Sequence, residues 1–218
     1  MQIVDVGYVI KAIKYGEHSA VVTIVSKENG KVVGFVKSAF SKKKANIFEL
    51  GNYVEFEATA RLEDNMPIIK AELLRPNAIY FISNQDKLEV LCKIANQLNK
   101  LLPEKQDIER LFYYLDSFFN FIDEDNWLVF YAYFEFYLLE FLGIGIDLTS
   151  CVATETTENL AYVSPKSARA VCLEAGEPYK DKMFLYPHFI VNGELNPTKE
   201  ELDDCFNMCE YFLTSFNK

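Results

Sequence analysis

The segment SAVVTIVSKENGKVVGFVKSAF, residues 19–40, decides how the first part of this chain folds. Two runs rich in β-branched and aromatic residues flank KENGK. Asn29-Gly30 inside KENGK is the strongest short signal for a β-hairpin. The segment therefore predicts two antiparallel strands, over residues 19–26 and 31–40.

Three further runs of the same kind surround this hairpin. They are VGYVIKAIKY (6–15), YVEFEATARLE (53–63) and PIIKAELLR (67–75), and EDNMP predicts a turn between the last two. Five short antiparallel strands have to close on themselves to remove exposed edges. An N-terminal five-stranded OB-fold barrel is the smallest familiar solution, and an SH3-like barrel is the alternative that the pattern leaves open.

In the second part of the chain, the spacing of the apolar residues changes from that of strands to that of helices. Apolar residues recur at helical spacing in 86–103, 107–122, 125–145 and 197–216. From Trp127 to Gly143, the apolar run of the third segment is interrupted only by the charged residues Glu135 and Glu140. This run is shorter than the roughly 20 apolar residues of a membrane span, so we expect a buried central helix and no membrane association. An α+β protein follows, with an OB-fold domain over 1–80 and an α-helical domain over 81–218.

The charge is divided unevenly between these two parts. The 218 residues carry a net charge of −10, but residues 1–80 hold 11 Lys and Arg against 9 Asp and Glu, whereas residues 81–218 hold 11 against 23. Phosphate binding depends on Lys and Arg, so any nucleic acid is expected on the first part. Five cysteines, an odd number, predict free thiols, and the absence of an export leader predicts a cytoplasmic protein.

No catalytic arrangement stands out. The chain has only two histidines, His18 and His188, and it lacks a phosphate-binding glycine loop, a dinucleotide fingerprint and a nucleophile elbow. We therefore expect a protein that is not an enzyme.

Basic and aromatic residues are interleaved in the first part, as in barrels that bind single-stranded nucleic acid. The aromatic residues are Tyr8, Tyr15, Phe35 and Phe40. The basic candidates are Lys11, Lys14, Lys37, Arg61, Lys70 and Arg75 in or beside strands, and Lys42, Lys43 and Lys44 in the loop after the third strand. Alternatively, the lysines only protect strand edges and the aromatic residues fill the barrel.

The segment 149–179 has the spacing of a zinc module without its full ligand set. Cys151 and Cys172 stand where each of two Cys-x-x-Cys pairs would begin, but Thr154 and Ala175 occupy the second positions. Neither residue replaces a thiolate, and Cys205 and Cys209 lie on an apolar helical stripe. We predict no metal or other cofactor, and we regard Cys151 and Cys172 as vestigial.

Three stretches resemble the bacterial RecO family of DNA repair proteins. They are GYVIKAIKYGEHSAVVTIVSKENGKVVGFVKSAFSKKK (7–44), NYVEFEATARLEDNMPIIKAELL (52–74) and LGIGIDLTSCVATETTENLAYVSPKSARAVCLEAGEPY (142–179). The resemblance implies an OB-fold followed by a helical domain with a zinc-finger-like insertion. Many members carry a four-cysteine zinc module there, and others have lost it.

The resemblance also implies a function and partners. Family members are recombination mediators that bind single- and double-stranded DNA and anneal complementary strands. With RecR they load RecA onto DNA coated by single-strand-binding protein, whose C-terminal tail binds the helical domain. They are not hydrolases, and a nucleoid-associated location in the cytoplasm follows.

The acidic second part limits where DNA could contact it. We expect contacts there only at local basic spots such as Lys166 and Arg169. The alternative function is a non-catalytic protein-interaction scaffold with little DNA affinity.

Overall fold

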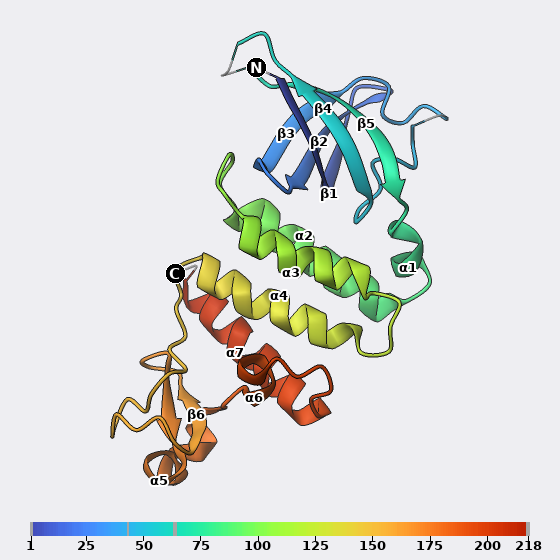
Figure 1. Ribbon diagram of the computed structural model, residues 1–218. Coiled ribbons are helices and arrows are strands. Elements are labelled where there is room, and N and C mark those ends of the chain that lie inside the picture. Colours follow the sequence, from blue (N-terminus) through green and yellow to red (C-terminus); the bar gives the residue numbers. More distant parts are fainter. Residues whose placement is uncertain (1, 43, 63–64, 217–218) are drawn as a thin grey trace. The chain divides into compact units, whose positions relative to one another are not determined.

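The computed structural model describes residues 2–42, 44–62 and 65–216 (Figure 1). The chain divides into two compact units, residues 1–113 and 114–218. Within the described residues, no helix is long and apolar enough to cross a membrane.

The first unit is built on a closed five-stranded barrel. Its strands are β1 (Gln2–Tyr15), β2 (Ser19–Ser26), β3 (Gly30–Val36), β4 (Tyr53–Thr59) and β5 (Ile68–Arg75). They follow one another around the barrel as β1-β2-β3-β5-β4, and the long β1 pairs with both β2 and β4. β3 meets β5 in parallel at Phe35 and Ile68. This arrangement is that of an OB-fold, so the predicted barrel is confirmed and the SH3-like alternative is not adopted.

The predicted hairpin between β2 and β3 is also confirmed. Gly30 ends the turn with φ 64°, a conformation that glycine adopts without steric cost. The buried Asp5 carboxylate of β1 accepts hydrogen bonds from the backbone N–H groups of Glu28 (3.0 Å) and Asn29 (3.1 Å) and from the Asn29 side chain (2.8 Å). One carboxylate thus fastens the turn to the neighbouring strand.

The barrel interior is filled by small and β-branched residues with a few aromatic ones. The core includes Val9, Val22, Ile24, Val36, Val54, Phe56, Ala58 and Ile69. Gly34 of β3 permits the closure, because a Cβ there would lie 2.6 Å from the Ile69 side chain and 2.9 Å from the Pro67 carbonyl oxygen. A side chain at this position would therefore force β3 away from β5.

Two helices of the first unit follow the barrel: α1 (Ala78–Ile82) and α2 (Gln85–Leu101). Asn84 caps α2 by accepting a hydrogen bond from the Lys87 N–H (3.0 Å). The predicted apolar stripe is buried at Leu91, Ile94, Ala95 and Leu98, although Leu88 at its start is exposed. Both helices pack in the same compact unit as the barrel, and a domain boundary near residue 80 stays a prediction.

Helix α3 (Glu109–Asn120) spans the division between the units, and the second unit contains the helices α4 (Trp127–Phe141) and α7 (Lys199–Phe216). Eight of the fifteen residues of α4 are buried, as expected for a central helix. The Tyr131 ring of α4 stacks on Phe206 of α7, with centroids 5.1 Å apart. Thr198 caps α7 by accepting from the Glu201 N–H (3.2 Å) and by donating to the Glu201 carboxylate (2.8 Å).

A small sheet interrupts the helices of the second unit, and Figure 1 shows it to one side of α4 and α7. Its strands β6 (Leu160–Ser164), β7 (Arg169–Cys172) and β8 (Phe184–Leu185) are ordered β7-β6-β8. The short helices α5 (Leu173–Gly176), η1 (Glu177–Lys182) and α6 (His188–Asn192) accompany it. The zinc-finger-like insertion is therefore a sheet of its own.

Candidate nucleic-acid interface

The outer side of β1, β2 and β3 carries an ordered set of polar, apolar and aromatic side chains. Residues directly opposite each other in an antiparallel pair project to the same side, and the alternate residues Val22 and Ile24 fill the core. Two successive rows run across the three strands. The first row is Lys11, Thr23 and Val33, and the second row is Ile13, Val21 and Phe35. We call these six residues, with Tyr15 at the end of β1 and Lys37 after β3, the barrel face.

The barrel face has an exposed aromatic and apolar centre. Tyr15 is 64% exposed and Ile13 is 51% exposed. The Tyr15 ring meets Phe35 edge-on, with centroids 5.7 Å apart and an angle of 87° between the planes. Ile68 of β5, which lies opposite Phe35, extends this patch. Exposed aromatic rings of this kind serve as platforms on which bases stack.

A lysine-rich loop borders the barrel face at one end. The Phe40 N–H donates to the His18 carbonyl (3.1 Å), which holds the loop after β3 against the turn between β1 and β2. This contact brings the loop to the end of the barrel where β1 ends. Lys14 of β1 lies there opposite the buried Ala20 of β2, in the register that alternates with Ile13 and Tyr15. The loop lysines are Lys37, Lys42 and Lys44, of which Lys37 and Lys42 are exposed and Lys44 is half-buried, while Lys43 lies outside the described residues.

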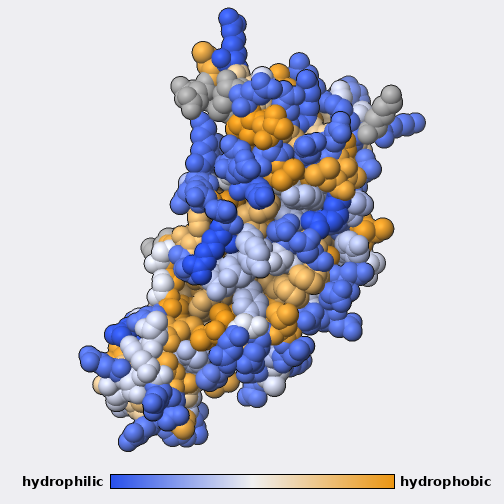
Figure 2. Space-filling model, viewed as in Figure 1, coloured by the Kyte–Doolittle hydropathy of each residue, from blue (hydrophilic) through white to orange (hydrophobic). Residues whose placement is uncertain are grey.

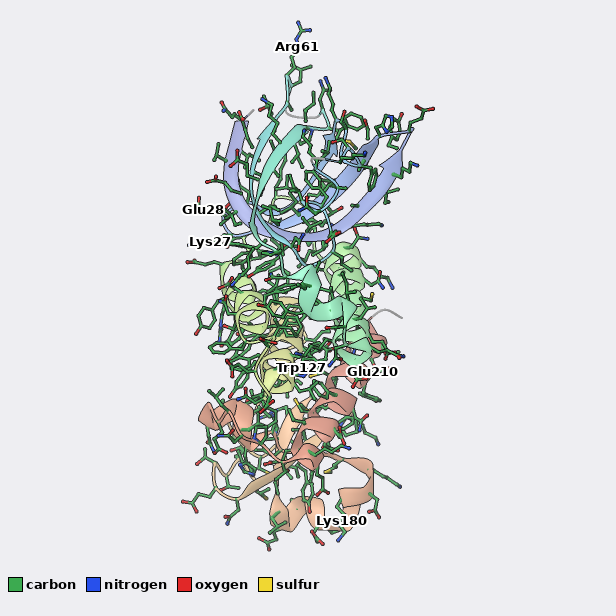
Figure 3. All side chains as sticks on the ribbon, turned by 90° about the vertical axis from the view of Figure 1, so that its right-hand side faces the viewer. Lys27, Glu28, Arg61, Trp127, Lys180 and Glu210 are labelled. Carbon is green, nitrogen blue, oxygen red and sulfur yellow. The ribbon has the colours of Figure 1, made fainter. Side chains whose placement is uncertain are left out.

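The loop between β4 and β5 reaches the same end of the barrel. Its Pro67 carbonyl accepts a hydrogen bond from the Phe35 N–H (2.8 Å). Arg61 of this loop is exposed, and Figure 3 shows it extending away from the barrel at the end opposite to Lys27 and Glu28. Arg61 is therefore open to solvent at this end of the barrel, where it adds positive charge.

A groove of about 680 Å³ adjoins the barrel face at Val33. Val33 belongs to both, and Ile3, Met66 and Lys105 are among the residues that line the groove. Glu28 and Glu104 line it as well, so its charge is mixed. The groove therefore adjoins the barrel face with a lining of mixed polarity.

Two predicted basic residues lie elsewhere on the barrel. Lys70 of β5 is directly opposite Glu57 of β4, and the neighbouring pair is Glu55 and Glu72. The outer side of β4 and β5 is therefore acidic, although Figure 2 shows apolar residues among the hydrophilic ones on the barrel surface.

Arg75 is engaged within the protein. Its guanidinium donates to the Tyr8 hydroxyl (2.7 Å) and lies over the Tyr53 ring, 5.1 Å from the centroid. Tyr8 itself is fully buried, so one of the four predicted aromatic residues belongs to the interior.

The remaining basic candidates belong to the second unit. Lys166 is exposed in the turn between β6 and β7, while Arg169 of β7 forms an ion pair with Asp147 (3.0 Å). Hydrogen bonds from the Thr149 hydroxyl and N–H, and then the Arg169 contact, hold the pKa of Asp147 below its usual range. Arg169 is thus partly neutralised, which leaves Lys166 as the stronger of the two basic spots.

Cys151 and Cys172, which we predicted to be remnants of a zinc module, are both buried. Thr154 places its hydroxyl 3.6 Å from the Cys172 sulfur. Burial raises the pKa of the Cys151 thiol, but hydrogen bonds from the Thr154 hydroxyl and from nearby backbone N–H groups prevail and lower the pKa to about 6. Zinc does not fit this site, because Thr154 and Ala175 stand at the other two ligand positions. No group of three potential ligands occurs among the residues that the structure describes.

Sequence reasoning missed the apolar members of the barrel face. Ile13, Val21 and Ile68 sit in strands whose apolar residues occur on both sides, and a barrel interior needs only one side. The excess of apolar residues was the available signal that these strands also present an apolar surface to the outside.

Comparison with known proteins relates both parts of the chain to one family. Residues 1–77 match the family model described as Recombination protein O N terminal, and residues 86–215 match Recombination protein O C terminal. The DNA repair protein RecO of Rickettsia peacockii is 33% identical over 216 residues, which cover 99% of this chain and 91% of that protein. The DNA repair protein RecO of Bartonella tribocorum is 38% identical over 208 residues, which cover 93% of this chain and 82% of that protein.

Proposed function

Because the chain belongs to the RecO family of DNA repair and recombination proteins, we propose that it binds single- and double-stranded DNA and anneals complementary strands. We further propose that it helps to load RecA onto DNA coated with single-strand-binding protein. The family consists of non-catalytic recombination mediators, so the chain is not an enzyme.

The observation that carries this proposal is the barrel face. Tyr15 and Phe35 offer ring surfaces to bases, and Lys11 lies on the same outer side. The exposed Lys37 follows directly after β3. Lysines in the loop after β3, together with Arg61, can contact phosphates on either side of this patch. Stacking and phosphate contacts together suit a single strand, whose bases are accessible, and phosphate contacts alone suffice for a duplex.

Annealing follows from the same arrangement. Two complementary strands repel each other through their phosphates, and lysines that neutralise part of this charge lower the barrier to their encounter. The protein then needs no catalytic group, since base pairing supplies the free energy.

Protein partners would engage the acidic helical part. Residues 81–218 carry more than twice as many acidic as basic residues, which disfavours extended contact with DNA. We propose that this part contacts RecR and the C-terminal tail of single-strand-binding protein, and that the protein works at the nucleoid in the cytoplasm. Lys166 could add a local DNA contact.

The test is the annealing rate of two complementary labelled oligonucleotides, measured bare and after coating with the cognate single-strand-binding protein. We expect acceleration in both cases, and loss of acceleration when Lys37, Lys42 and Lys44 are replaced by Glu. Lys70→Glu on the acidic side of the barrel is the matched control and should anneal normally. Unchanged annealing by the triple variant would show that the lysine-rich loop is not part of the interface.

A scaffold with little DNA affinity is the second candidate, and the acidic outer side of β4 and β5 favours it. This scaffold would bind RecR but would show no salt-dependent DNA binding. Binding isotherms on labelled oligonucleotides at two salt concentrations separate the two functions.

A further inference from the structure

The dipeptide Asn-Gly occurs twice in the chain, at Asn29-Gly30 and at Asn192-Gly193. It is chemically reactive, because the backbone nitrogen of a glycine is not shielded by a side chain and can approach the side-chain amide of the asparagine closely. The two copies have the same intrinsic reactivity, so any difference between them in the folded protein comes from their surroundings.

The reaction of this dipeptide is deamidation, and water is its only co-reactant. A bond forms between the glycine nitrogen and Cγ of the asparagine, while the bond from Cγ to Nδ2 breaks. The amide group leaves as ammonia and takes up the proton of the glycine nitrogen. Water then opens the cyclic imide at either of its carbonyl groups, which gives aspartate or isoaspartate. Ring closure requires the backbone to rotate, so a firmly held backbone slows it.

Asn29-Gly30 is firmly held by the barrel. The Asn29 N–H and its side-chain amide both donate to the Asp5 carboxylate (3.1 and 2.8 Å), and Gly30 pairs with Ser26 in the ladder between β2 and β3. Gly30 is buried, and a Cβ on it would collide with the Gln106 carbonyl oxygen. Rotation of this backbone therefore requires the closed barrel to open.

Asn192-Gly193 is held only by a short helix. Asn192 is the last of the five residues of α6, and the Gly193 N–H donates to the Phe189 carbonyl. Both residues of the dipeptide are exposed. Apart from chain neighbours, no described atom lies within 4 Å of the place where a Cβ on Gly193 would be. A single helical turn is only marginally stable and opens locally without unfolding of the whole unit.

We propose that Asn192 is a site of spontaneous deamidation in the folded protein, and that Asn29 is protected for as long as the barrel stays closed. The rate at each site follows the free energy of the opening that exposes it. Asn192 should convert at least ~10-fold faster than Asn29, the factor that a difference of about 1.4 kcal/mol in opening free energy gives. The proposal does not depend on the DNA-binding function.

Conversion of Asn192 changes a contact of the second unit. Its side-chain amide donates to the Glu194 carboxylate (2.8 Å), and the product places a carboxylate there instead, so that like charges repel. The Glu194 carbonyl accepts from the Tyr133 hydroxyl of α4 (3.2 Å), and the Leu195 carbonyl accepts from the Asn126 amide (3.1 Å). Deamidation therefore loosens the segment after α6 from α4.

The test is incubation of the full chain at mildly alkaline pH, in buffer and in concentrated urea, with peptide mass spectrometry to locate aspartate and isoaspartate. In buffer we expect the ratio given above, and in urea we expect similar rates at Asn29 and Asn192. Asp5→Ala should speed the reaction of Asn29 in buffer and leave that of Asn192 unchanged. Asn192→Gln keeps an amide but requires a larger ring, so it should react far more slowly.

Equal rates at the two sites in buffer, or a faster reaction of Asn29, would overturn the proposal. Conversion of Asn192 in urea but not in buffer would do so as well. If Asp5→Ala does not fold, the native chain in buffer and in urea decides alone. Hydrogen exchange tests the consequence: the Glu194 N–H, which donates to the Phe189 carbonyl, should exchange faster in Asn192→Asp than in Asn192→Gln. Equal exchange would show that the new charge does not loosen the segment.

Discussion

Tyr15 at the end of β1 meets Phe35 of β3 edge-on, with ring centroids 5.7 Å apart, although the strand β2 separates the two. The contact spans three strands on the outer side of the barrel. It orients one exposed ring and fixes it in place, so that less freedom is lost when a base stacks on it.

Replacing Tyr15 by Ala should weaken single-strand binding. Stacking of a base on an aromatic side chain contributes ~1–3 kcal/mol, and duplex DNA, whose bases are stacked internally, should lose much less. Fluorescence anisotropy with single- and double-stranded oligonucleotides measures both. Tyr113→Ala, which removes another highly exposed tyrosine, is the control. Equal losses on both kinds of DNA would contradict stacking.

The lysine-rich loop after β3 should determine much of the salt dependence of DNA binding. Replacing Lys37, Lys42 and Lys44 by Gln should lower the slope of log affinity against log salt by about 2 on single strands, because each phosphate contact contributes ~0.7. The slope of Lys70→Gln should stay that of the native chain, since Glu57 lies opposite this lysine. A large fall in the slope for Lys70→Gln would show that DNA also contacts the outer side of β4 and β5.

Asp5→Ala should destabilise the first unit by roughly 2–4 kcal/mol, because several part-buried N–H donors lose a charged acceptor. Asp5→Asn keeps one acceptor oxygen and should lose less. Urea denaturation, followed by circular dichroism, gives the free energy of unfolding. Glu55→Ala on the exposed side of β4 is a matched control and should change little.

Arg75→Gln should lower stability by ~1–3 kcal/mol and leave the salt slope of DNA binding unchanged, because it removes a charged hydrogen-bond donor from Tyr8. The same urea and anisotropy measurements test both parts. A reduced slope would show instead that Arg75 contacts DNA.

Asp204 should make the second unit less stable as the pH rises. Burial raises the pKa of Asp204, and the nearby Glu200 adds to this, although the Leu185 N–H opposes it. The folded state therefore binds more protons than the unfolded state, and stability falls as the pH rises from the unfolded pKa through the raised folded pKa. Asp204→Asn, which keeps an acceptor for Leu185, should reduce this fall in melts between pH 4 and pH 7, whereas Asp203→Asn should not.

The barrel was predictable because its signals are local. Asn29-Gly30 specifies a turn wherever it occurs between two strands, and the strand runs show the required composition. The helix α7 was likewise predictable from Pro197-Thr198, whose hydroxyl caps it. In each case neighbouring residues carry the signal, although distant ones such as Asp5 then stabilise the structure.

The interface was less predictable because it depends on which residues become neighbours. Asp5 accepts hydrogen bonds from a turn that lies 23 residues further along the chain. Lys70 and Arg75 have the same local appearance as Lys11, yet strand register sets Lys70 against Glu57, and packing places Arg75 over Tyr53. The strand β8, with two residues, forms only because β6 pairs with it.

Because the outer side of β4 and β5 is acidic, it repels a polyanion such as DNA. Only the other side of the barrel is then open to binding. A strand held on the barrel face has no favourable path around the circumference, so it must arrive and depart on the same side. A strand bound in this way would leave the side that faces away from the barrel open to solvent. That exposure is what a second, complementary strand needs, since it can begin to pair before the first strand has been released.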